Sequence, residues 1–302
     1  MKKNKLILID GNHMLHRAFH KYASMMTPQN ESTSMVYGFP YMLRKIINDN
    51  KKAEVIVIFD GKNRSKRRLA ALPGYKRREP KLGFDRENFI HQKSEVIRVL
   101  SYLGIKVAMS DEEEGDDILY LVAKKYKAKG YHITIVSGDK DFNQLICDNI
   151  YQFQPGAFKK PDILLTPENL EEEKGYKANQ CVSYLSLLGD SSDKIPGYPG
   201  IGDKRAKNFL NQFGTLKNAI KLGGDNFKFG SVNFKELETL YKVNKLLIDL
   251  KYYNRKYLRR MEIPWVNKNT TKFNKKELLK VAKQYHIGTF VKTDFLKHFK
   301  DN

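Results

Sequence analysis

The chain has 302 residues, of which 41% are hydrophobic and 12% aromatic, so it is long and apolar enough to bury a full core and is not a disordered chain. Lysine and arginine number 55 against 34 aspartates and glutamates, and the formal net charge of +21 favours a polyanionic partner such as nucleic acid. The two cysteines, Cys147 and Cys181, exclude a disulfide framework and a cysteine-based zinc site. No apolar run approaches the roughly 18 residues of a membrane helix, and the apolar stretch at residues 6–9 is too short for a signal peptide, so we expect a cytoplasmic protein.

Short β-branched runs alternate with helical patterns in the first half of the chain. We expect strands at residues 5–9, 55–59, 105–109, 133–136 and 150–153, and helices at residues 36–50, 85–103 and 115–128. This order predicts an α/β fold with a mostly parallel twisted sheet flanked by helices. In such sheets ligands bind beyond the carboxyl ends of the strands.

The second half of the chain is predicted to be helical. After a loop rich in proline and lysine at residues 154–161, helical patterns occupy residues 179–188, 203–213, 215–222, 234–250, 275–285 and 291–299. We therefore expect an α/β domain at residues 1–160 and a helical part at residues 161–302.

Carboxylates follow three of the predicted strands. The motifs are Ile-Asp-Gly-Asn at residues 9–12, Phe-Asp-Gly at 59–61 and Gly-Asp-Lys-Asp at 138–141. A single aspartate after a strand is usually a helix cap or a turn former. Three such aspartates at the same edge of one sheet indicate a shared site.

Two further acidic groups extend this set. Glu-Gly-Asp-Asp at residues 114–117 opens a predicted helix, where acids also favour the helix dipole, and Gly-Asp-Ser-Ser-Asp occupies residues 189–193. The candidate metal ligands are Asp10, Asp60, Glu114, Asp116, Asp117, Asp139, Asp141, Asp190 and Asp193. So many carboxylates in one cleft repel one another unless cations neutralise them, and ligation by oxygen alone suits Mg²⁺ or Mn²⁺. Two such ions roughly 4 Å apart can promote phosphodiester cleavage, so the pattern predicts a nuclease.

The five acidic motifs, in this order, resemble those of the 5′-nuclease, or flap endonuclease, superfamily over about residues 5–250. The resemblance implies a PIN-like 5′-nuclease fold and a structure-specific, metal-dependent 5′ to 3′ exonuclease and flap endonuclease with two Mg²⁺ ions, which Mn²⁺ can replace. It places Asp10, Asp60, Glu114 and Asp116 nearer one ion and the acids from Asp139 onward nearer the other. Gly115 departs from the alanine that the family commonly has there.

The resemblance is greatest to the bacteriophage ribonuclease H type, because of residues 241–250 and the basic C-terminal helices. It implies DNA substrates with a flap, a 5′ overhang, a nick or a gap. It also suggests RNA–DNA hybrids as substrates and the removal of RNA primers in DNA replication as a role. The same resemblance suggests a monomeric enzyme in a bacterial or phage-infected cell. Its suggested protein partners are a single-stranded-DNA-binding protein or a sliding clamp.

A basic segment at about residues 61–86 resembles the arch through which the family passes a single-stranded 5′ end. On this resemblance Tyr75 stacks on a base and Lys76 contacts the scissile phosphate. The family's second basic residue falls on Glu79 here, so Arg78 is the expected substitute. The other arch residues expected to contact DNA are Arg64, Lys66, Arg67, Arg68 and Arg77.

A glycine-rich stretch at residues 197–206 resembles the helix-hairpin-helix element of the family, at about residues 181–215, which holds duplex phosphates. Taken alone, such a stretch is more often an ordinary turn capped by Asp203. The residues expected to contact DNA are Gly200, Gly202, Lys204, Arg205 and Lys207, and the resemblance raises K⁺ as a further ion at this turn.

Two alternatives remain at this point. A non-catalytic, structure-specific DNA clamp would require the acids to be incidental. A Toprim-type phosphotransferase would use Asp139, Asp141 and an upstream glutamate. It leaves Asp60, Asp190, Asp193 and the glycine-rich turn without a role.

Overall fold

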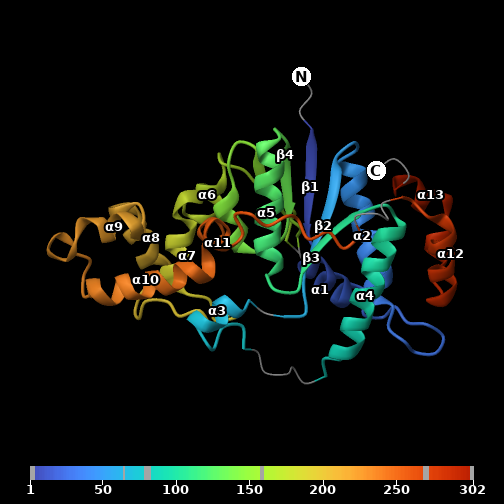
Figure 1. Ribbon diagram of the computed structural model, residues 1–302, viewed down its shortest axis with the longest axis horizontal. Helices are drawn as coiled ribbons and strands as arrows, with labels where there is room; N and C mark the ends of the chain where they lie inside the picture. Colours follow the sequence, from blue (N-terminus) through green and yellow to red (C-terminus); the bar gives the residue numbers. More distant parts are fainter. Residues whose placement is uncertain (1–3, 64, 78–82, 157–159, 268–271, 300–302) are drawn as a thin grey trace. The chain divides into compact units, whose positions relative to one another are not determined.

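The computed structural model describes residues 4–63, 65–77, 83–156, 160–267 and 272–299 (Figure 1). The chain divides into two compact units that are each discontinuous in sequence. The α/β unit comprises Met1–Gly61, Pro80–Ser137 and Glu262–Asn302, and the helical unit comprises Lys62–Glu79 and Gly138–Met261. The sequence predicts a single boundary near residue 160 instead.

Four parallel strands form the centre of the α/β unit. They are β1 (Lys5–Asp10), β2 (Glu54–Asp60), β3 (Lys106–Ser110) and β4 (His132–Val136), in the order β3-β2-β1-β4. Their central residues are almost completely buried, as expected of a parallel sheet with both faces covered. Because all four strands are parallel, Asp10 and Asp60 end β1 and β2 at the same edge of the sheet.

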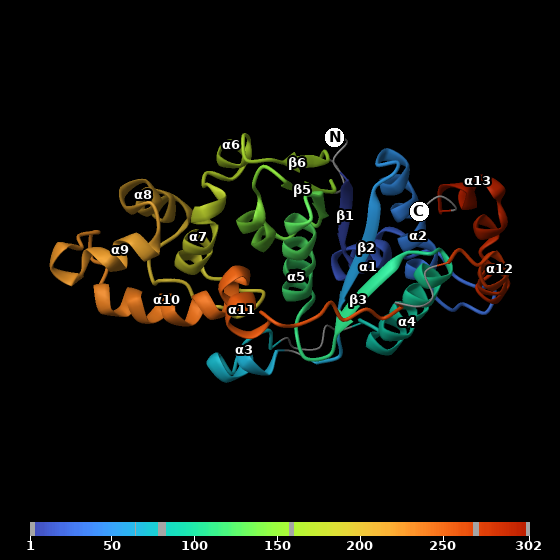
Figure 2. The ribbon, with the colours of Figure 1, turned by 45° about the horizontal axis from the view of Figure 1, so that its top comes forward.

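Helices cover both faces of this sheet. They are α1 (Gly11–Lys21), α2 (Ser34–Asp49), α4 (Arg86–Tyr102) and α5 (Gly115–Ala128). Figures 1 and 2 show α5 on one face and α1, α2 and α4 on the other. The sheet also includes the antiparallel pair β5 and β6, whose bounds are given below. The sheet is thus mostly parallel and flanked by helices, which confirms the predicted fold class.

The C-terminal segment belongs to the α/β unit and protects its outer strand. The backbone N–H of Met109 donates to the Pro264 carbonyl at 3.1 Å, and that of Val266 donates to the Val107 carbonyl at 2.9 Å. The buried Asn267 side chain accepts from the Val107 N–H at 2.9 Å and donates to the Ile105 carbonyl at 2.7 Å. The chain then continues into α12 (Lys275–Gln284), which packs on α4, and into η4 (Gly288–Val291), α13 (Thr293–Leu296) and η5 (Lys297–Phe299).

The helical unit is built around its own core, in which Phe209, Leu216 and Leu237 are fully buried. Its elements are α3 (Lys66–Ala71), η1 (Lys140–Leu145), the antiparallel strands β5 (Ile150–Gln154) and β6 (Ile163–Leu165), α6 (Leu170–Lys174), η2 (Ala178–Gln180), α7 (Cys181–Leu188), α8 (Asp203–Phe213), α9 (Leu216–Leu222), η3 (Gly224–Asn226), α10 (Phe234–Ile248) and α11 (Leu250–Tyr257). The helix predicted at residues 234–250 ends early because Asp249 caps a new helix, accepting from the Tyr252 N–H at 2.8 Å. None of the helices in the described ranges combines the length and the apolar character needed to cross a bilayer.

Candidate metal and nucleic-acid site

The carboxylates that end β1 and β2 are held in place by hydrogen bonds. Asp10 accepts from the backbone N–H of His13 at 3.0 Å and from the Ser137 hydroxyl at 2.6 Å. Asp60 accepts from the backbone N–H of Gly115 at 2.6 Å and from the Asn12 side-chain amide. Both carboxylates are therefore fixed at the carboxyl end of the sheet before any ligand binds.

The acids at the start of α5 lie beside Asp60. Glu114 occupies the position before the helix and Asp117 lies in its first turn, and both are buried, whereas Asp116 is half-buried. A Cβ atom on Gly115 would lie 2.8 Å from Oδ1 of Asp60. A side chain at position 115 would therefore crowd the Asp60 carboxylate, and glycine avoids that contact.

The remaining acids form a second group within the helical unit. Asp139 accepts from the backbone N–H of Asp141 at 2.8 Å. Asp190 accepts from the N–H and the hydroxyl of Ser192, at 2.8 and 2.6 Å. Two lysines complete the group, since Nζ of Lys140 lies 2.9 Å from Asp190 and Nζ of Lys76 lies 3.7 Å from Asp193.

The electrostatics of this second group show that its carboxylates repel one another. Burial raises the pKa of Asp139, and the negative charges of Asp193 and Asp190 raise it further. Burial and the Asp139 and Asp193 charges raise the pKa of Asp141 well above its ordinary value. Burial also acts on Asp190, but hydrogen bonds from Ser192 and Lys140 outweigh it and lower the pKa of that carboxyl. Buried carboxylates with raised pKa values are suited to bind a cation.

The nine predicted ligands thus lie in two groups, five in the α/β unit and four in the helical unit. Across the described ranges, no three aspartate, glutamate, histidine or cysteine side chains come close enough together to form a cage around a metal ion. The donors in both groups are carboxylate oxygens alone, which fits a hard divalent cation rather than zinc.

Two residues of the basic segment do not have the predicted contacts. The Tyr75 side chain is 2% exposed and packs in the core of the helical unit, so its ring offers no face to a base. Arg68 is 1% exposed, donates to the Leu247 carbonyl at 3.2 Å and lies 4.1 Å from the centre of the Tyr253 ring. The predicted stacking role of Tyr75 and the predicted DNA contact of Arg68 are therefore wrong for this structure, because both side chains are buried by packing.

The other basic residues of this segment are accessible where they are described. Lys66, Arg67 and Arg77 are exposed, and the Arg67 guanidinium lies 4.9 Å from the centre of the Tyr257 ring. Arg64 and Arg78 lie outside the described residues. Lys76 is half-buried, and its backbone N–H donates to the Asp193 carbonyl at 2.9 Å.

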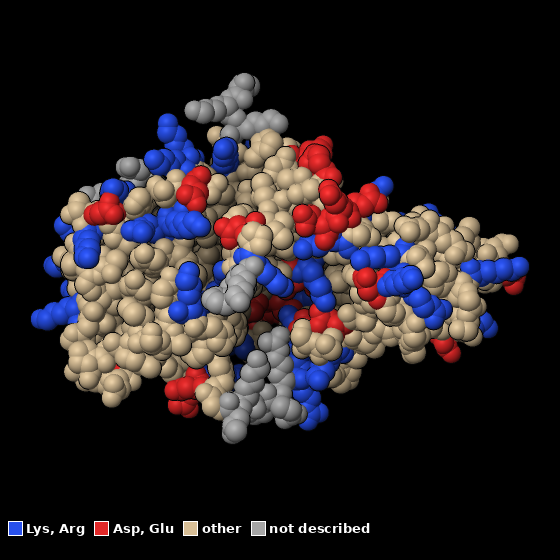
Figure 3. All heavy atoms as spheres, turned by 180° about the vertical axis from the view of Figure 1, so that it is seen from behind, with Lys and Arg blue, Asp and Glu red and all other residues tan. Residues whose placement is uncertain are grey.

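The glycine-rich turn joins α7 to α8. Gly200 has a φ of +74°, which other residues rarely adopt, and its carbonyl accepts from the Arg205 guanidinium at 2.9 Å. Gly202 precedes α8, with open space where a Cβ atom would lie. Lys204 is exposed, and Lys207 pairs with Asp203 at 3.0 Å. Figure 3 shows lysine and arginine side chains on the face of the molecule that is seen from behind the view of Figure 1.

Sequence reasoning missed three residues that support these groups. The buried Asn244 donates to the Ser186 and Pro196 carbonyls at 3.0 and 2.7 Å, which ties α10 to α7 and to the residue that precedes the glycine-rich stretch. Lys93 donates to the Asp60 carbonyl at 2.6 Å, and burial lowers the pKa of its ammonium group. Asn12 and Asn244 lie in two stretches that carry the family resemblance, residues 9–12 and 241–250, without a role for either side chain, whereas no sequence signal marks Lys93.

Comparison with known proteins identifies the family. A family model described as 5′-3′ exonuclease, N-terminal resolvase-like domain, matches residues 5–175, and one described as 5′-3′ exonuclease, C-terminal SAM fold, matches residues 176–252. The chain belongs to the 5′-3′ exonuclease family. This confirms the resemblance drawn from the acidic motifs, and the family consists of nucleases.

Relatives of two kinds match the chain. The 5′-3′ exonuclease of Aquifex aeolicus is 28% identical over 281 residues, which cover 92% of this chain and 94% of that protein. The thermostable DNA polymerase I of Thermus aquaticus is 36% identical over 220 residues, which cover 72% of this chain and 25% of that protein. The chain therefore spans about a quarter of the length of the polymerase relatives that it matches.

Solved structures share the fold along almost the whole chain. The T5 D15 protein co-crystallised with metal ions aligns with a TM-score of 0.69 at 19% identity, covering 98% of this chain and 97% of that one. Flap endonuclease-1 from Methanococcus jannaschii aligns with a TM-score of 0.56 at 18% identity, covering 98% and 91%. At these identities the similarity establishes the fold, and the substrates of this chain require a separate argument.

Proposed function

We propose that the protein is a structure-specific, metal-dependent 5′ to 3′ exonuclease and flap endonuclease. The observation that carries the proposal is the acid group of the helical unit. There burial and the charges of Asp193 and Asp190 raise the pKa of Asp139, burial and the charges of Asp139 and Asp193 raise the pKa of Asp141, and Lys76 lies 3.7 Å from Asp193. Mutually repelling carboxylates next to a lysine suit divalent cations and a phosphate. The nine predicted ligands are proposed to bind two Mg²⁺ ions, which Mn²⁺ can replace.

The proposed chemistry is hydrolysis of a phosphodiester without a covalent intermediate. Divalent ions, when bound, supply a water nucleophile of lowered pKa and offset the charge that develops on the phosphate. Lys76, held near Asp193, is positioned to contact the scissile phosphate and to stabilise that charge.

Duplex DNA is proposed to be held by the glycine-rich turn. Backbone N–H groups near Gly200 and Gly202, at the start of α8, can approach a phosphate closely, and K⁺ is the proposed ion at this turn. Lys204, Arg205 and Lys207 add positive charge, and the exposed Lys66, Arg67 and Arg77 give the basic segment a salt-dependent grip on the backbone.

The proposed substrates are DNA with a 5′ flap, a 5′ overhang, a nick or a gap, and RNA–DNA hybrids, so that the enzyme removes RNA primers during DNA replication. Two findings support a role in DNA metabolism. The T5 D15 flap endonuclease was solved with DNA and metal ions, and the matched region of the Thermus aquaticus protein is part of a DNA polymerase I. A monomer that meets a single-stranded-DNA-binding protein or a sliding clamp is the proposed working form.

A cleavage assay with two substrates tests the proposal. A 5′-labelled flap duplex and an RNA–DNA hybrid are incubated with Mg²⁺, with Mn²⁺ or with EDTA, using the wild type, Asp139→Asn and, as control, Asp148→Asn at an exposed position. We expect metal-dependent cutting near the junction that Asp139→Asn abolishes while binding persists and that Asp148→Asn leaves intact. Tight flap binding without cutting in either metal would contradict the nuclease and favour the clamp.

A further inference from the structure

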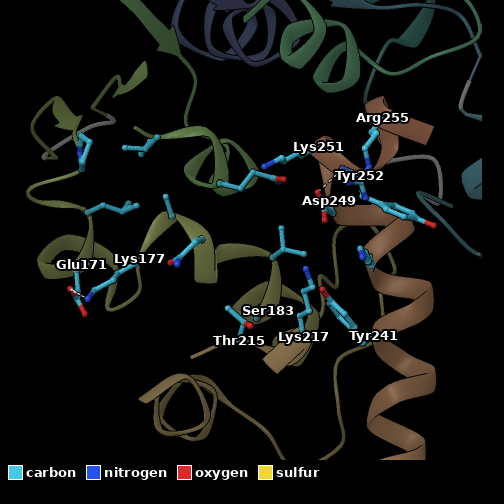
Figure 4. Close-up of a pocket in the computed structure, with 18 of the residues that line it drawn as sticks. Glu171, Lys177, Ser183, Thr215, Lys217, Tyr241, Asp249, Lys251, Tyr252 and Arg255 are labelled. Atoms are coloured by element: carbon cyan, nitrogen blue, oxygen red, sulfur yellow. Dashed lines mark hydrogen bonds and ion pairs between the residues drawn. The ribbon is translucent and has the colours of Figure 1, made fainter. Parts of the chain in front are cut away.

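The helical unit contains a cavity of about 710 Å³ that none of the nine predicted metal ligands lines. Its walls come from η1, α6, α10 and α11 and from the first residues of α7 and α9 (Figure 4). Its volume lies within the roughly 300–1,000 Å³ that is usual for ligand sites. We call this cavity the α6–α11 groove.

The α6–α11 groove combines an apolar wall with a cationic one. The half-buried Val182 provides apolar surface, with the buried side chains of Ile146 and Leu170 behind the lining. Figure 4 shows Lys251 and Arg255 on α11, with Lys217 near Tyr241 and, at the far end, the paired Glu171 and Lys177. The groove can therefore bury an apolar group while it pairs with anionic ones.

The cations at the α11 side are available to a ligand. In the part of the chain that the structure describes, Lys217, Lys251 and Arg255 form no ion pair with a neighbouring acid, and all three are exposed. Asp249 is the nearest acid of this wall, but its carboxylate caps the backbone N–H of Tyr252. Asp249 offsets part of the Lys251 charge, whereas Lys217 and Arg255 have no such neighbour among the interactions of Asp249. Three exposed cations beside an apolar surface are complementary to an anionic ligand with an apolar part.

The tyrosines of the groove argue against a nucleic-acid strand as this ligand. Single-stranded nucleic acid is held by bases that stack on free aromatic faces. Here the Lys245 ammonium lies 4.6 Å from the centre of the Tyr252 ring and 5.7 Å from that of Tyr241, and Lys256 lies 5.5 Å from the Tyr252 ring. Ammonium groups thus occupy the ring faces, and Glu168 in the lining adds a charge that repels a continuous phosphate backbone.

We propose that the α6–α11 groove binds a short acidic peptide segment of a partner protein, with an apolar side chain of that segment packed against Val182 at the apolar part of the lining. Its carboxylates pair with Lys217, Lys251 and Arg255. The site is separate from the proposed nuclease chemistry, so peptide binding and DNA cleavage can be measured independently.

Fluorescence anisotropy with a designed probe tests this proposal. The probe is the labelled peptide Asp-Leu-Asp-Asp-Leu-Asp, measured with the full chain at about 150 mM salt to suppress long-range attraction. The control peptides replace both leucines with serine or all aspartates with asparagine. We expect each replacement to weaken binding by about tenfold or more, because one removes the apolar anchor and the other the charge pairs.

A pair of matched charge-reversal variants locates the site. Lys217→Glu/Lys251→Glu changes the groove, whereas Lys221→Glu/Lys228→Glu makes the same change in net charge at exposed positions that do not line it. We expect the first variant to weaken probe binding by about tenfold or more and the second by less than about threefold. Circular dichroism establishes that both variants are folded.

Three outcomes would overturn the proposal. An equal loss of binding in both double variants would mean that only net charge attracts the probe. Equal binding of the serine peptide would mean that no apolar anchor is buried. Displacement of the probe by hexathymidylate, with oligonucleotide binding that is also lost in Lys217→Glu/Lys251→Glu, would make the groove a nucleic-acid site.

Discussion

Replacing Arg68 with methionine should destabilise the helical unit and leave its affinity for DNA unchanged. The guanidinium is buried, donates to the Leu247 carbonyl at 3.2 Å and lies 4.1 Å from the centre of the Tyr253 ring. A hydrogen bond from a charged donor contributes about 1.5–3 kcal/mol, and a desolvated cation–π contact about 2 kcal/mol. Because methionine recovers part of the packing, we expect a net loss of about 3 kcal/mol and a Tm lower by roughly 6–10 °C.

Urea unfolding followed by circular dichroism measures this loss, and Arg67→Met is the matched control. Arg67 is exposed over the Tyr257 ring, so its replacement should cost less than about 1 kcal/mol. It should instead weaken flap binding and reduce the salt dependence of the affinity by about one phosphate contact. If Arg68→Met unfolded at the wild-type urea midpoint but lost affinity for flap DNA, the reasoning from burial would be refuted.

Four further changes test other parts of the structure. Asn244→Ala should cost about 2–3 kcal/mol in urea unfolding and weaken flap binding, because the buried Ser186 carbonyl and the Pro196 carbonyl lose their donor; unchanged values for both would contradict its role next to the glycine-rich turn. Asn267→Ala should cost a similar amount, about 2–3 kcal/mol, without changing flap affinity, since it frees the edge of β3. Lys76→Ala should slow single-turnover flap cutting by about 10²–10³-fold with little change in Kd, whereas Lys66→Ala should change mainly Kd. Burial and neighbouring cations lower the pKa of His13 from 6.5 to about 4, so between these pH values the unfolded chain binds a proton at this residue and the folded chain does not. The free energy of unfolding should therefore fall as the pH drops from 6.5 to 4. His13→Gln should make the urea midpoint less dependent on pH in this range.

Local patterns in the sequence predicted the strands and most helices well. The strands β1 to β5 begin and end within about one residue of the predicted ones, since buried β-branched runs in a parallel sheet are distinct in sequence. The short strand β6 was not predicted. The helix α1 was not predicted, although its buried residues Met14, Leu15 and Ala18 follow helical spacing. The end of α10 was misplaced because the apolar pattern continues through Asp249, where only the cap shows that a new helix begins.

Long-range packing explains what the sequence could not predict. Residues 262–267 form hydrogen bonds with the backbone of β3, although the two segments are about 160 residues apart in sequence. No local sequence pattern predicts that pairing. The acid motifs were readable because each follows a strand or opens a helix. Arg68 looked like a surface charge among other basic residues, because its partners Leu247 and Tyr253 lie nearly 180 residues away.

The burial of Tyr75 explains why a tyrosine directly precedes Lys76. The Tyr75 ring is anchored in the core of the helical unit, and the next residue, at a φ of +49°, donates its N–H to the Asp193 carbonyl. That backbone bond and the 3.7 Å ion pair keep the Lys76 ammonium beside an acid of the same unit. The aromatic ring therefore acts as an anchor that positions the lysine, and the accuracy of that position depends on packing within the helical unit rather than on any contact between Tyr75 and a base.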